Sequence, residues 1–232
     1  MSGRVSVATF DCYGTLVDWE GGLGTSLYSH ALASGIEDPP AGRRLRERWE
    51  EIQFEVITGD YRPYREVLNE SSRLLCHELG WPWSDADGES LLHAMQSWQP
   101  FPDTIPALQR AKAAGMRLAI LSNTDRAIIA HTLRQLEPIE FDEVIVAEDV
   151  RSYKPAPPHF ARAREMLGVD PGEVLHVAFG FRYDIAPAQA AGFSGAWVNR
   201  HGESKPGGAT PDYEWRNLWG LAELAESLAP SD

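Results

Sequence analysis

The stretch TFDCYGTLVDWE, residues 9–20, joins the end of an apolar segment to a carboxylate and a glycine. The segment VSVATF at 5–10 is mostly apolar and rich in β-branched residues, which is typical of a strand covered on both faces. In an open α/β sheet, ligands bind at the carboxyl ends of the strands, because the loops that follow form a crevice there. Asp11 comes directly after this strand and is therefore a candidate for chemistry.

Four further segments share this pattern: RLAILS at 117–122, EVIVA at 143–147, VLHVAF at 174–179 and GAWVN at 195–199. Helical segments lie between them, after Asp125, from Pro157 and from Asp184. The alternation of strand and helix is the pattern of βαβ units. The sequence therefore predicts an α/β fold, a Rossmann-like doubly wound parallel sheet. A Gly/Pro-rich loop at 202–215 and a last helix at roughly 217–228 are expected to follow.

The first crossover is much longer than the others. About a hundred residues separate the first two strands, where a dozen or so would suffice. They contain four expected helices, at 23–35, 42–58, 64–79 and about 84–97. We therefore expect an α/β core domain of residues 1–17 and 98–232, and an inserted helical cap domain of residues 18–97. Such a cap would close over Asp11 and exclude water.

The composition excludes several classes of partner. Asp and Glu number 34 against 21 Lys and Arg, so the net charge of −13 repels nucleic acid and anionic membrane surfaces. Two cysteines, Cys12 and Cys76, are too few for a disulfide framework or a thiolate metal site, which favours a reducing cytoplasm. The N-terminus lacks an extended apolar region, and no later run approaches the roughly 20 apolar residues of a membrane span. We expect a soluble protein that is not exported.

Chemistry-bearing residues follow each of the first four predicted strands. Asp11 follows the first, Ser122 and Asn123 end the second, Lys154 in SYKP follows the third, and Asp184 follows the fourth. In a parallel sheet these positions converge on one edge, where they supply a nucleophile, its charge partner, a base and binding donors. No glycine-rich phosphate loop or dinucleotide motif accompanies them.

In their order and spacing, these motifs resemble those of the haloacid dehalogenase superfamily of hydrolases. DCYGTLVD matches the first motif, LSNT the second, YKP the lysine motif and YDIAPAQAAG the acidic fourth, and the match covers essentially the whole chain. The resemblance implies that Asp11 is the nucleophile, that Lys154 fixes its charge and that Asp184 is the acid of the last motif. It also implies a set of residues that bind a small anionic organic substrate: Cys12, Tyr13, Thr15, Ser122 and Asn123.

The position two residues after the nucleophile distinguishes two branches of this superfamily. Its phosphatases carry an aspartate there, which protonates a leaving alkoxide, whereas this chain has Tyr13, a poor general acid at neutral pH. A halide leaving group needs no proton. The phosphatases also hold Mg²⁺ with acidic residues of the fourth motif, where this chain has Phe179, Gly180 and Phe181 ahead of the single Asp184. The resemblance is therefore closest to the 2-haloacid dehalogenases, which implies displacement at carbon without a metal or other cofactor.

The sequence departs from that branch at the leaving-group site. Those dehalogenases carry an arginine after a tryptophan of an early cap helix, and the matching residue here is Glu50. A carboxylate cannot bind a departing halide, so we expect Glu50 to face away from the pocket and activity on short 2-haloacids to be low unless Arg46 or Arg182 reaches in. Phe179 and Phe181 replace a serine and an asparagine of that branch, which predicts a more apolar pocket.

Three functions stay open at this point. Hydrolytic dehalogenation of a small 2-haloacid through an aspartyl ester is favoured by the motifs. A Mg²⁺-dependent phosphatase of a small phosphomonoester, using Asp11 and Asp184, and a non-catalytic binding or regulatory protein are the alternatives. The histidines His131, His159 and His176 lack metal-ligand spacing and are expected to be surface or satisfied core residues. The oligomeric state is left open, with a homodimer among the alternatives.

Overall fold

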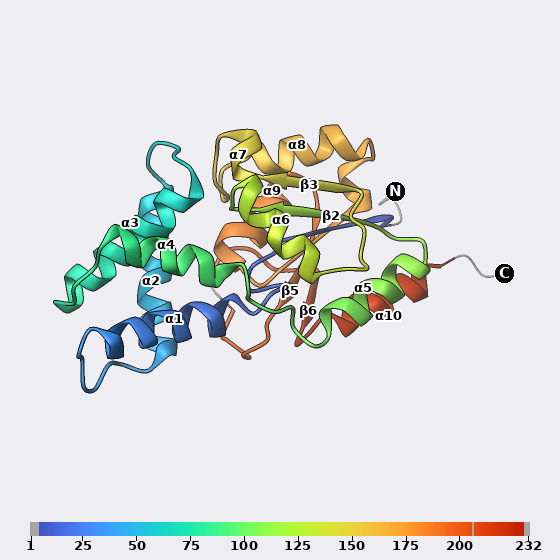
Figure 1. The fold of residues 1–232 in the computed structure, drawn as a ribbon. Coiled ribbons are helices and arrows are strands. Elements are labelled where there is room, and N and C mark those ends of the chain that lie inside the picture. Colours follow the sequence, from blue (N-terminus) through green and yellow to red (C-terminus); the bar gives the residue numbers. More distant parts are fainter. Residues whose placement is uncertain (1–4, 206, 230–232) are drawn as a thin grey trace.

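The structure is a computed structural model that describes residues 5–205 and 207–229. Its core is a six-stranded sheet with the strand order β3-β2-β1-β4-β5-β6, in which every neighbouring pair is parallel. The strands are β1 Val7–Phe10, β2 Arg117–Ser122, β3 Glu143–Val146, β4 Val174–Ala178, β5 Ser194–Val198 and β6 Tyr213–Trp215. The predicted α/β fold is confirmed, with β1 in the interior of the sheet (Figure 1). Residues 1–4 and 230–232, which the expected core range includes, and residue 206 of the expected loop lie outside the described part.

Helices cover both faces of this sheet. One face is covered by α5 Thr104–Ala113, α6 Arg126–Gln135 and α10 Trp219–Leu228, and the other by α8 Pro158–Leu167 and α9 Ala186–Ala190. Three short elements complete the core: α7 Ala147–Val150, a 3₁₀ turn at Pro171–Glu173 and a π-helical turn at Phe181–Ile185. Ala8 and Phe10 of β1 pack toward the first face and Val7 toward the second. Because both faces are buried, the strand segments are apolar at successive positions.

Of the helices between β1 and β2 in the chain, α5 covers the sheet and the other four lie beside it in Figure 1: α1 Trp19–Ala33, α2 Gly42–Ile57, α3 Tyr64–Leu79 and α4 Asp85–Met95. The first begins at Trp19 rather than at residue 23, because the Asp18 carboxylate caps it by accepting a hydrogen bond from the Gly21 N–H at 2.9 Å. A glycine lets α1 approach α2 closely, since a Cβ on Gly24 would lie 3.0 Å from the Gly42 carbonyl oxygen. The inserted helical segment of the predicted fold is thereby confirmed.

The inserted helices are tied to the sheet edge at the start of α3. The Asp125 carboxylate, which follows β2, accepts hydrogen bonds from the backbone N–H groups of Tyr64 at 2.8 Å and Arg65 at 3.1 Å. A carboxylate at a helix N-terminus satisfies free N–H groups and complements the helix dipole. The Tyr153 hydroxyl also donates to the backbone oxygen of Arg62 at 2.8 Å. These contacts hold α3 over the carboxyl ends of the strands.

Two parts of the core differ from the sequence-based expectation. An unbroken loop at 202–215 is wrong for Tyr213–Trp215, which pair with β5 as β6. Three residues, none of them fully buried, are too few to form a recognisable strand pattern in the sequence. They are identified as a strand only by their pairing with β5 in the structure. The helices α5 and α7 were not predicted. Within the described residues, no helix combines the length and apolarity needed to cross a membrane.

Candidate active site

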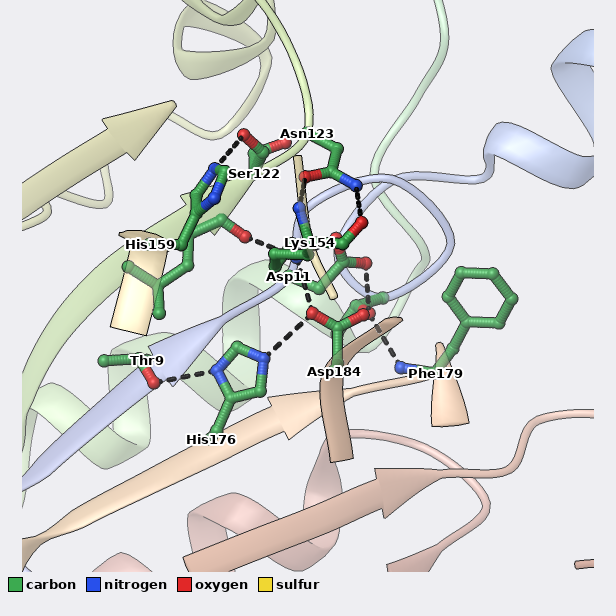
Figure 2. A network of polar contacts seen from close by, with 11 residues as sticks. Thr9, Asp11, Ser122, Asn123, Lys154, His159, His176, Phe179 and Asp184 are labelled. Carbon is green, nitrogen blue, oxygen red and sulfur yellow. Dashed lines mark hydrogen bonds and ion pairs between the residues drawn. The ribbon is translucent and has the colours of Figure 1, made fainter. Parts of the chain in front are cut away.

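The carboxyl ends of three neighbouring strands bring the predicted site residues together. Because β1 lies between β2 and β4, Asp11 after β1 meets Ser122 at the end of β2 and the turn after β4. Asp184 lies in that turn, the π-helical segment Phe181–Ile185. Lys154 enters from the loop that follows β3 and α7. Figure 2 shows the side chains of Asp11, Lys154 and Asp184 directed toward one another.

Lys154 lies at the centre of the site, with a side chain that is 1% exposed. Its Nζ donates hydrogen bonds to Asp11 Oδ1 at 3.0 Å, to Asp184 Oδ1 at 2.5 Å and to the Leu121 backbone oxygen at 2.7 Å. Burial alone would lower the pKa of Lys154, but the two neighbouring carboxylates outweigh it and raise the pKa. The ammonium is therefore charged, and all three of its N–H groups are used.

The Asp11 carboxylate is held at both oxygens. Oδ1 accepts from Lys154, and Oδ2 accepts from the Thr15 hydroxyl at 2.9 Å, which itself accepts from the backbone N–H of Phe179 at 2.9 Å. Burial raises the pKa of Asp11, and the Lys154 charge offsets only part of this rise. For Asp184, burial is outweighed by the Lys154 charge and by a hydrogen bond from His176, so its pKa is lowered. Environments that move two pKa values apart are typical of acids with different roles.

Ser122 and Asn123 differ in what their side chains contact. The Asn123 amide is bound to the backbone of Lys154, accepting from its N–H at 2.7 Å and donating to its carbonyl oxygen at 3.0 Å. Asn123 therefore fixes the loop that carries the lysine. The Ser122 hydroxyl is buried and has no hydrogen-bond partner among the described residues. A buried polar group without a partner, on a residue that lines the same cavity as Asp11, is available to a ligand.

Backbone N–H groups add further donors around Asp11. In the described part of the chain, those of Cys12, Tyr13 and Asn123 donate to no other backbone group. They follow directly on Asp11 and Ser122, at the ends of adjacent strands. Oriented backbone N–H groups of this kind form concave sites for anions.

A cavity that opens to solvent, with about 480 Å³ of empty space including the open part, is bounded on one side by this polar edge. The sheet edge contributes Asp11, Ser122, Asn123, Lys154 and Asp184 to its lining. The remaining wall is largely aromatic. The inserted helices contribute Trp19, Glu50, Gln53 and Tyr64 to it, and the core contributes Tyr13, Phe179 and Tyr183. A small cavity with apolar walls and a few convergent polar groups suits a small organic molecule.

A family model of haloacid dehalogenase-like hydrolases matches residues 5–192, a span that contains all the site residues described above. The chain belongs to the haloacid dehalogenase-like hydrolases. This hydrolase is 29% identical to an (S)-2-haloacid dehalogenase of Pseudomonas putida over 96% of each chain. It is 27% identical to haloacetate dehalogenase H-2 of Moraxella sp. (strain B) over 90% of this chain and 93% of that one. It is also similar to the solved structure of an L-2-haloacid dehalogenase from Xanthobacter autotrophicus, with a TM-score of 0.79, 26% identity and coverage of 97% and 100%.

Glu50 lines the cavity of this hydrolase together with Asp11, so the expectation that it faces away is wrong. It accepts a hydrogen bond at 3.1 Å from Arg46, which is one helical turn earlier on α2. Arg46 is 6% exposed and also pairs with Glu20 of α1 at 3.1 Å. These ion pairs fix the rotation of α2 about its own axis, so that Glu50 points toward the cavity. Burial raises the pKa of Glu50 to about 7, against the opposing charge of Arg46.

Neither arginine that was expected to reach in lines this cavity. Arg46 is engaged by its ion pairs, and the Arg182 guanidinium lies over the ring of Phe54, 3.2 Å from its centroid. Both line a neighbouring groove that shares Glu50, Phe179 and Tyr183 with the cavity. Among the described residues, Lys154 is thus the only lysine or arginine in the cavity lining.

Three predicted substrate contacts have other places in the hydrolase. The side chain of Cys12 is fully buried in the apolar core, and the Thr15 hydroxyl is used behind Asp11, so neither side chain lines the cavity. The ring of Tyr13 does line it, but its hydroxyl is hydrogen-bonded to Thr132 Oγ1 at 2.7 Å. Burial raises the pKa of Tyr13 well above its ordinary value. Tyr13 therefore contributes its ring to the cavity wall and is not an acid. Of Cys12, only the backbone N–H, which donates to no other backbone group, is left as a donor.

His176 was not identified from the sequence as part of the site. It lies on β4, fully buried, with Nε2 3.1 Å from Asp184 Oδ1. A titratable residue in the middle of the apolar segment VLHVAF, on the strand beside the one that precedes Asp11, is the signal that could have indicated it. His159, by contrast, is a buried core residue, but it is not fully satisfied as expected: Nε2 lies 3.2 Å from the Ser122 backbone oxygen, and Nδ1 has no partner among the described residues. Burial lowers its pKa to about 3.

The two acids of the site are bridged by an ammonium group. Lys154 Nζ is 3.0 Å from Asp11 and 2.5 Å from Asp184, and among the described residues no three His, Cys, Asp or Glu side chains are arranged to hold a metal ion. The Mg²⁺ ion of the phosphatase alternative prefers six oxygen ligands in octahedral geometry. Water can complete that shell beside one or two carboxylates, but here the Lys154 ammonium already lies between Asp11 and Asp184, and its positive charge opposes binding of a second cation.

Proposed function

We propose that this enzyme hydrolyses the carbon–halogen bond of a small 2-haloacid through an ester formed on Asp11. The observation that carries the proposal is the Lys154 bridge between Asp11 and Asp184 at the polar end of a small cavity. The similarity to enzymes named (S)-2-haloacid dehalogenase and haloacetate dehalogenase supports the same substrate class.

In the first step, an Asp11 oxygen attacks the carbon that bears the halogen. A carbon–oxygen bond forms, the carbon–halogen bond breaks in line, and the halide leaves with the bonding electron pair. Lys154 and Thr15 fix the carboxylate before the reaction, so little reorganisation is needed. The Lys154 charge also opposes the effect of burial, which favours protonated Asp11.

In the second step, water attacks the ester at the Asp11 carbonyl carbon. Asp184 accepts a proton from the water, whose oxygen bonds to that carbon. The bond between the carbonyl carbon and the substrate oxygen then breaks, and the departing alkoxide takes the proton from Asp184. The product is a 2-hydroxyacid, and the regenerated Asp11 carboxyl loses its proton to solvent. The lowered pKa of Asp184 keeps it ionised and ready to accept the proton.

The substrate carboxylate requires donors of its own in a protein of net charge −13. We assign this role to the unpartnered Ser122 hydroxyl and to the backbone N–H groups of Cys12, Tyr13 and Asn123. Preorganised donors in a site that excludes water stabilise an anion more strongly than the same groups in water.

We also propose that residues 18–97 act as a cap domain on a core of residues 1–17 and 98–232. Support comes from the cavity lining, since Trp19, Glu50 and Tyr64 of the inserted helices contribute to it. A cap that closes over the nucleophile keeps bulk water from the first step and strengthens the electrostatic contacts. Cytoplasmic location and a homodimer stay predictions, to be checked by fractionation and by light scattering.

A metal chelator is expected to leave turnover of a 2-haloacid unchanged. The reason is that the Lys154 ammonium pairs with both carboxylates of the site, so the positive charge that fixes Asp11 comes from the chain itself. The measurement is release of chloride from 2-chloropropionate, run beside release of phosphate from a small phosphomonoester, each with EDTA and with added Mg²⁺. Phosphate release that depends on Mg²⁺, without chloride release, would instead establish the phosphatase alternative.

The value of kcat/KM for a 2-haloacid is expected to pass through a maximum and to fall at both lower and higher pH. At low pH Asp11 becomes protonated and cannot attack. This loss occurs at a higher pH than is usual for an aspartate, because burial raises the pKa of Asp11. On the alkaline side Glu50, with a pKa raised to about 7, becomes an anion that repels the substrate. Glu50→Gln removes that charge and should raise kcat/KM above pH 7 by roughly tenfold. An alkaline fall that is unchanged in Glu50→Gln would exclude Glu50 as its source.

A further inference from the structure

Asp184 has a second buried partner besides Lys154. His176 Nε2 lies 3.1 Å from Asp184 Oδ1, and His176 Nδ1 lies 2.9 Å from the Thr9 hydroxyl. Thr9 on β1 and His176 on β4 are register partners in adjacent parallel strands, and both are fully buried. Figure 2 shows this chain of contacts running from Thr9 through His176 to Asp184.

The contacts of the His176 ring determine where its proton lies. An ionised carboxylate only accepts hydrogen bonds, so Nε2 must carry a proton and donate it to Asp184. In the neutral ring Nδ1 then accepts the hydrogen of the Thr9 hydroxyl, so both nitrogens are satisfied. Phe160 of α8 packs edge-on to the ring, with centroids 5.4 Å apart and planes at 82°, and fixes its orientation.

The two oxygens of Asp184 are consequently unequal. Oδ1 receives hydrogen bonds from both Lys154 and His176, whereas Oδ2 receives none from the described residues. Gly180 lies beside Oδ2, and a Cβ at that position would come within 2.6 Å of it. Oδ2 is therefore the oxygen that has both space and a free lone pair for a water molecule.

A purely structural role does not explain a histidine at this position. Val174 and Ala178, which point to the same side of β4, are apolar, and an apolar residue would fill the space without polar atoms to satisfy. The ring instead donates an N–H to the Asp184 carboxylate of the site.

We propose that His176 is a positioning residue for the second step of the reaction. It holds Asp184 with Oδ1 turned to Lys154, which directs Oδ2 toward the water that attacks the ester on Asp11. The inference rests on the proposed function, because it concerns hydrolysis of that ester. Displacement of the halide, which Asp11 performs with Lys154 and Thr15, does not depend on this contact.

Two amide substitutions of His176 separate its two contacts. In His176→Gln the amide N–H lies near the place of Nε2 and can donate to Asp184, whereas the shorter His176→Asn reaches only the place of Nδ1, near Thr9. The experiment mixes each enzyme with one equivalent of 2-chloropropionate and follows chloride, lactate and the intact protein mass over time. His176→Asn should release chloride at the wild-type rate but hydrolyse the ester about 10²-fold more slowly, so that protein carrying the ester accumulates. His176→Gln should hydrolyse it at a rate close to wild type.

Gly180→Ala provides a second test that leaves His176 in place. The backbone at residue 180 has φ −72°, which alanine adopts readily, but the new Cβ would displace Oδ2. Slow ester hydrolysis with normal chloride release is again expected.

Three outcomes would contradict the inference. One is equal slowing of chloride release and ester hydrolysis in His176→Asn, and another is ester hydrolysis at the wild-type rate in both His176→Asn and Gly180→Ala. Equal ester accumulation in the Asn and Gln variants would also overturn it, because the contact with Asp184 would then not matter. A wild-type enzyme that releases no chloride overturns the proposed function and this inference together, so the two failures are told apart by the wild-type reaction.

Discussion

Asp11→Asn is expected to lower chloride release from 2-chloropropionate by at least about 10⁴-fold, since the loss of a nucleophile removes the reaction path itself. Asparagine is nearly isosteric with aspartate, so the hydrogen bond from Thr15 can persist at the amide oxygen. The neutral amide cannot attack carbon, however, and it leaves the Lys154 charge with Asp184 alone. Thermal unfolding monitored by circular dichroism checks that the fold survives the change.

The control for this substitution is Asp38→Asn, an equal change of charge at an exposed residue between α1 and α2. It should leave chloride release at the wild-type rate. Intact mass measurement before each assay detects deamidation, which would restore aspartate at position 11. Turnover by verified Asp11→Asn protein would remove Asp11 from the mechanism.

Isotope labelling tests the same step in the unmodified enzyme. Because water attacks the carbonyl carbon of the ester, each turnover in H₂¹⁸O leaves one water oxygen on the Asp11 carboxylate. Peptide mass mapping after repeated turnover should therefore find ¹⁸O in the peptide that contains Asp11. Label confined to the product would mean that water attacks the substrate carbon directly.

The parts of the fold that follow local rules were predictable from the sequence. Continuous apolar segments identified five of the six strands, and the parallel arrangement then placed Asp11, Ser122, Lys154 and Asp184 at one edge. That convergence depends only on each residue following directly on a strand end or its loop. The sixth strand was missed because three residues are too few for any periodicity.

The inward face of α2 was not predictable in the same way. A helix pattern fixes which residues share a face, but the rotation of α2 about its own axis depends on contacts with other elements. Here the buried Arg46 pairs with Glu20 of α1 as well as with Glu50, and this network turns Glu50 into the cavity. His176 was missed for a related reason. Its role depends on contacts with Thr9 and Asp184, which belong to other segments of the chain.

Glu50→Arg is expected to raise chloride release from 2-chloropropionate by about 10²-fold. In-line displacement expels the halide away from Asp11, toward the wall of the cavity that the inserted helices form. Glu50 belongs to that wall and, as an anion, opposes the charge that develops on the departing halide. A cation there stabilises the developing charge, and one well-placed donor of this kind is worth roughly 10² to 10³ in rate. Arg46 keeps Glu20 as its partner after the substitution.

The gain should depend on pH, because the pKa of Glu50 is raised to about 7. Below pH 7 the wild-type residue is mostly neutral, and the ratio of Glu50→Arg to wild-type activity is smaller. Above pH 7 it is an anion, and the ratio grows. Rates for both proteins measured from acid to alkaline pH give this ratio directly.

The matched control is Glu51→Arg on the same helix, where the side chain is 67% exposed and pairs with Arg48. It changes the net charge of the protein by the same amount without placing a cation in the cavity lining, so chloride release should stay near the wild-type rate. An equal gain in both variants would assign the effect to the overall charge, which attracts any anionic substrate. A loss of activity in Glu50→Arg alone would mean that the halide leaves by another side of the cavity, and that Glu50 serves a substrate with a neutral or cationic group.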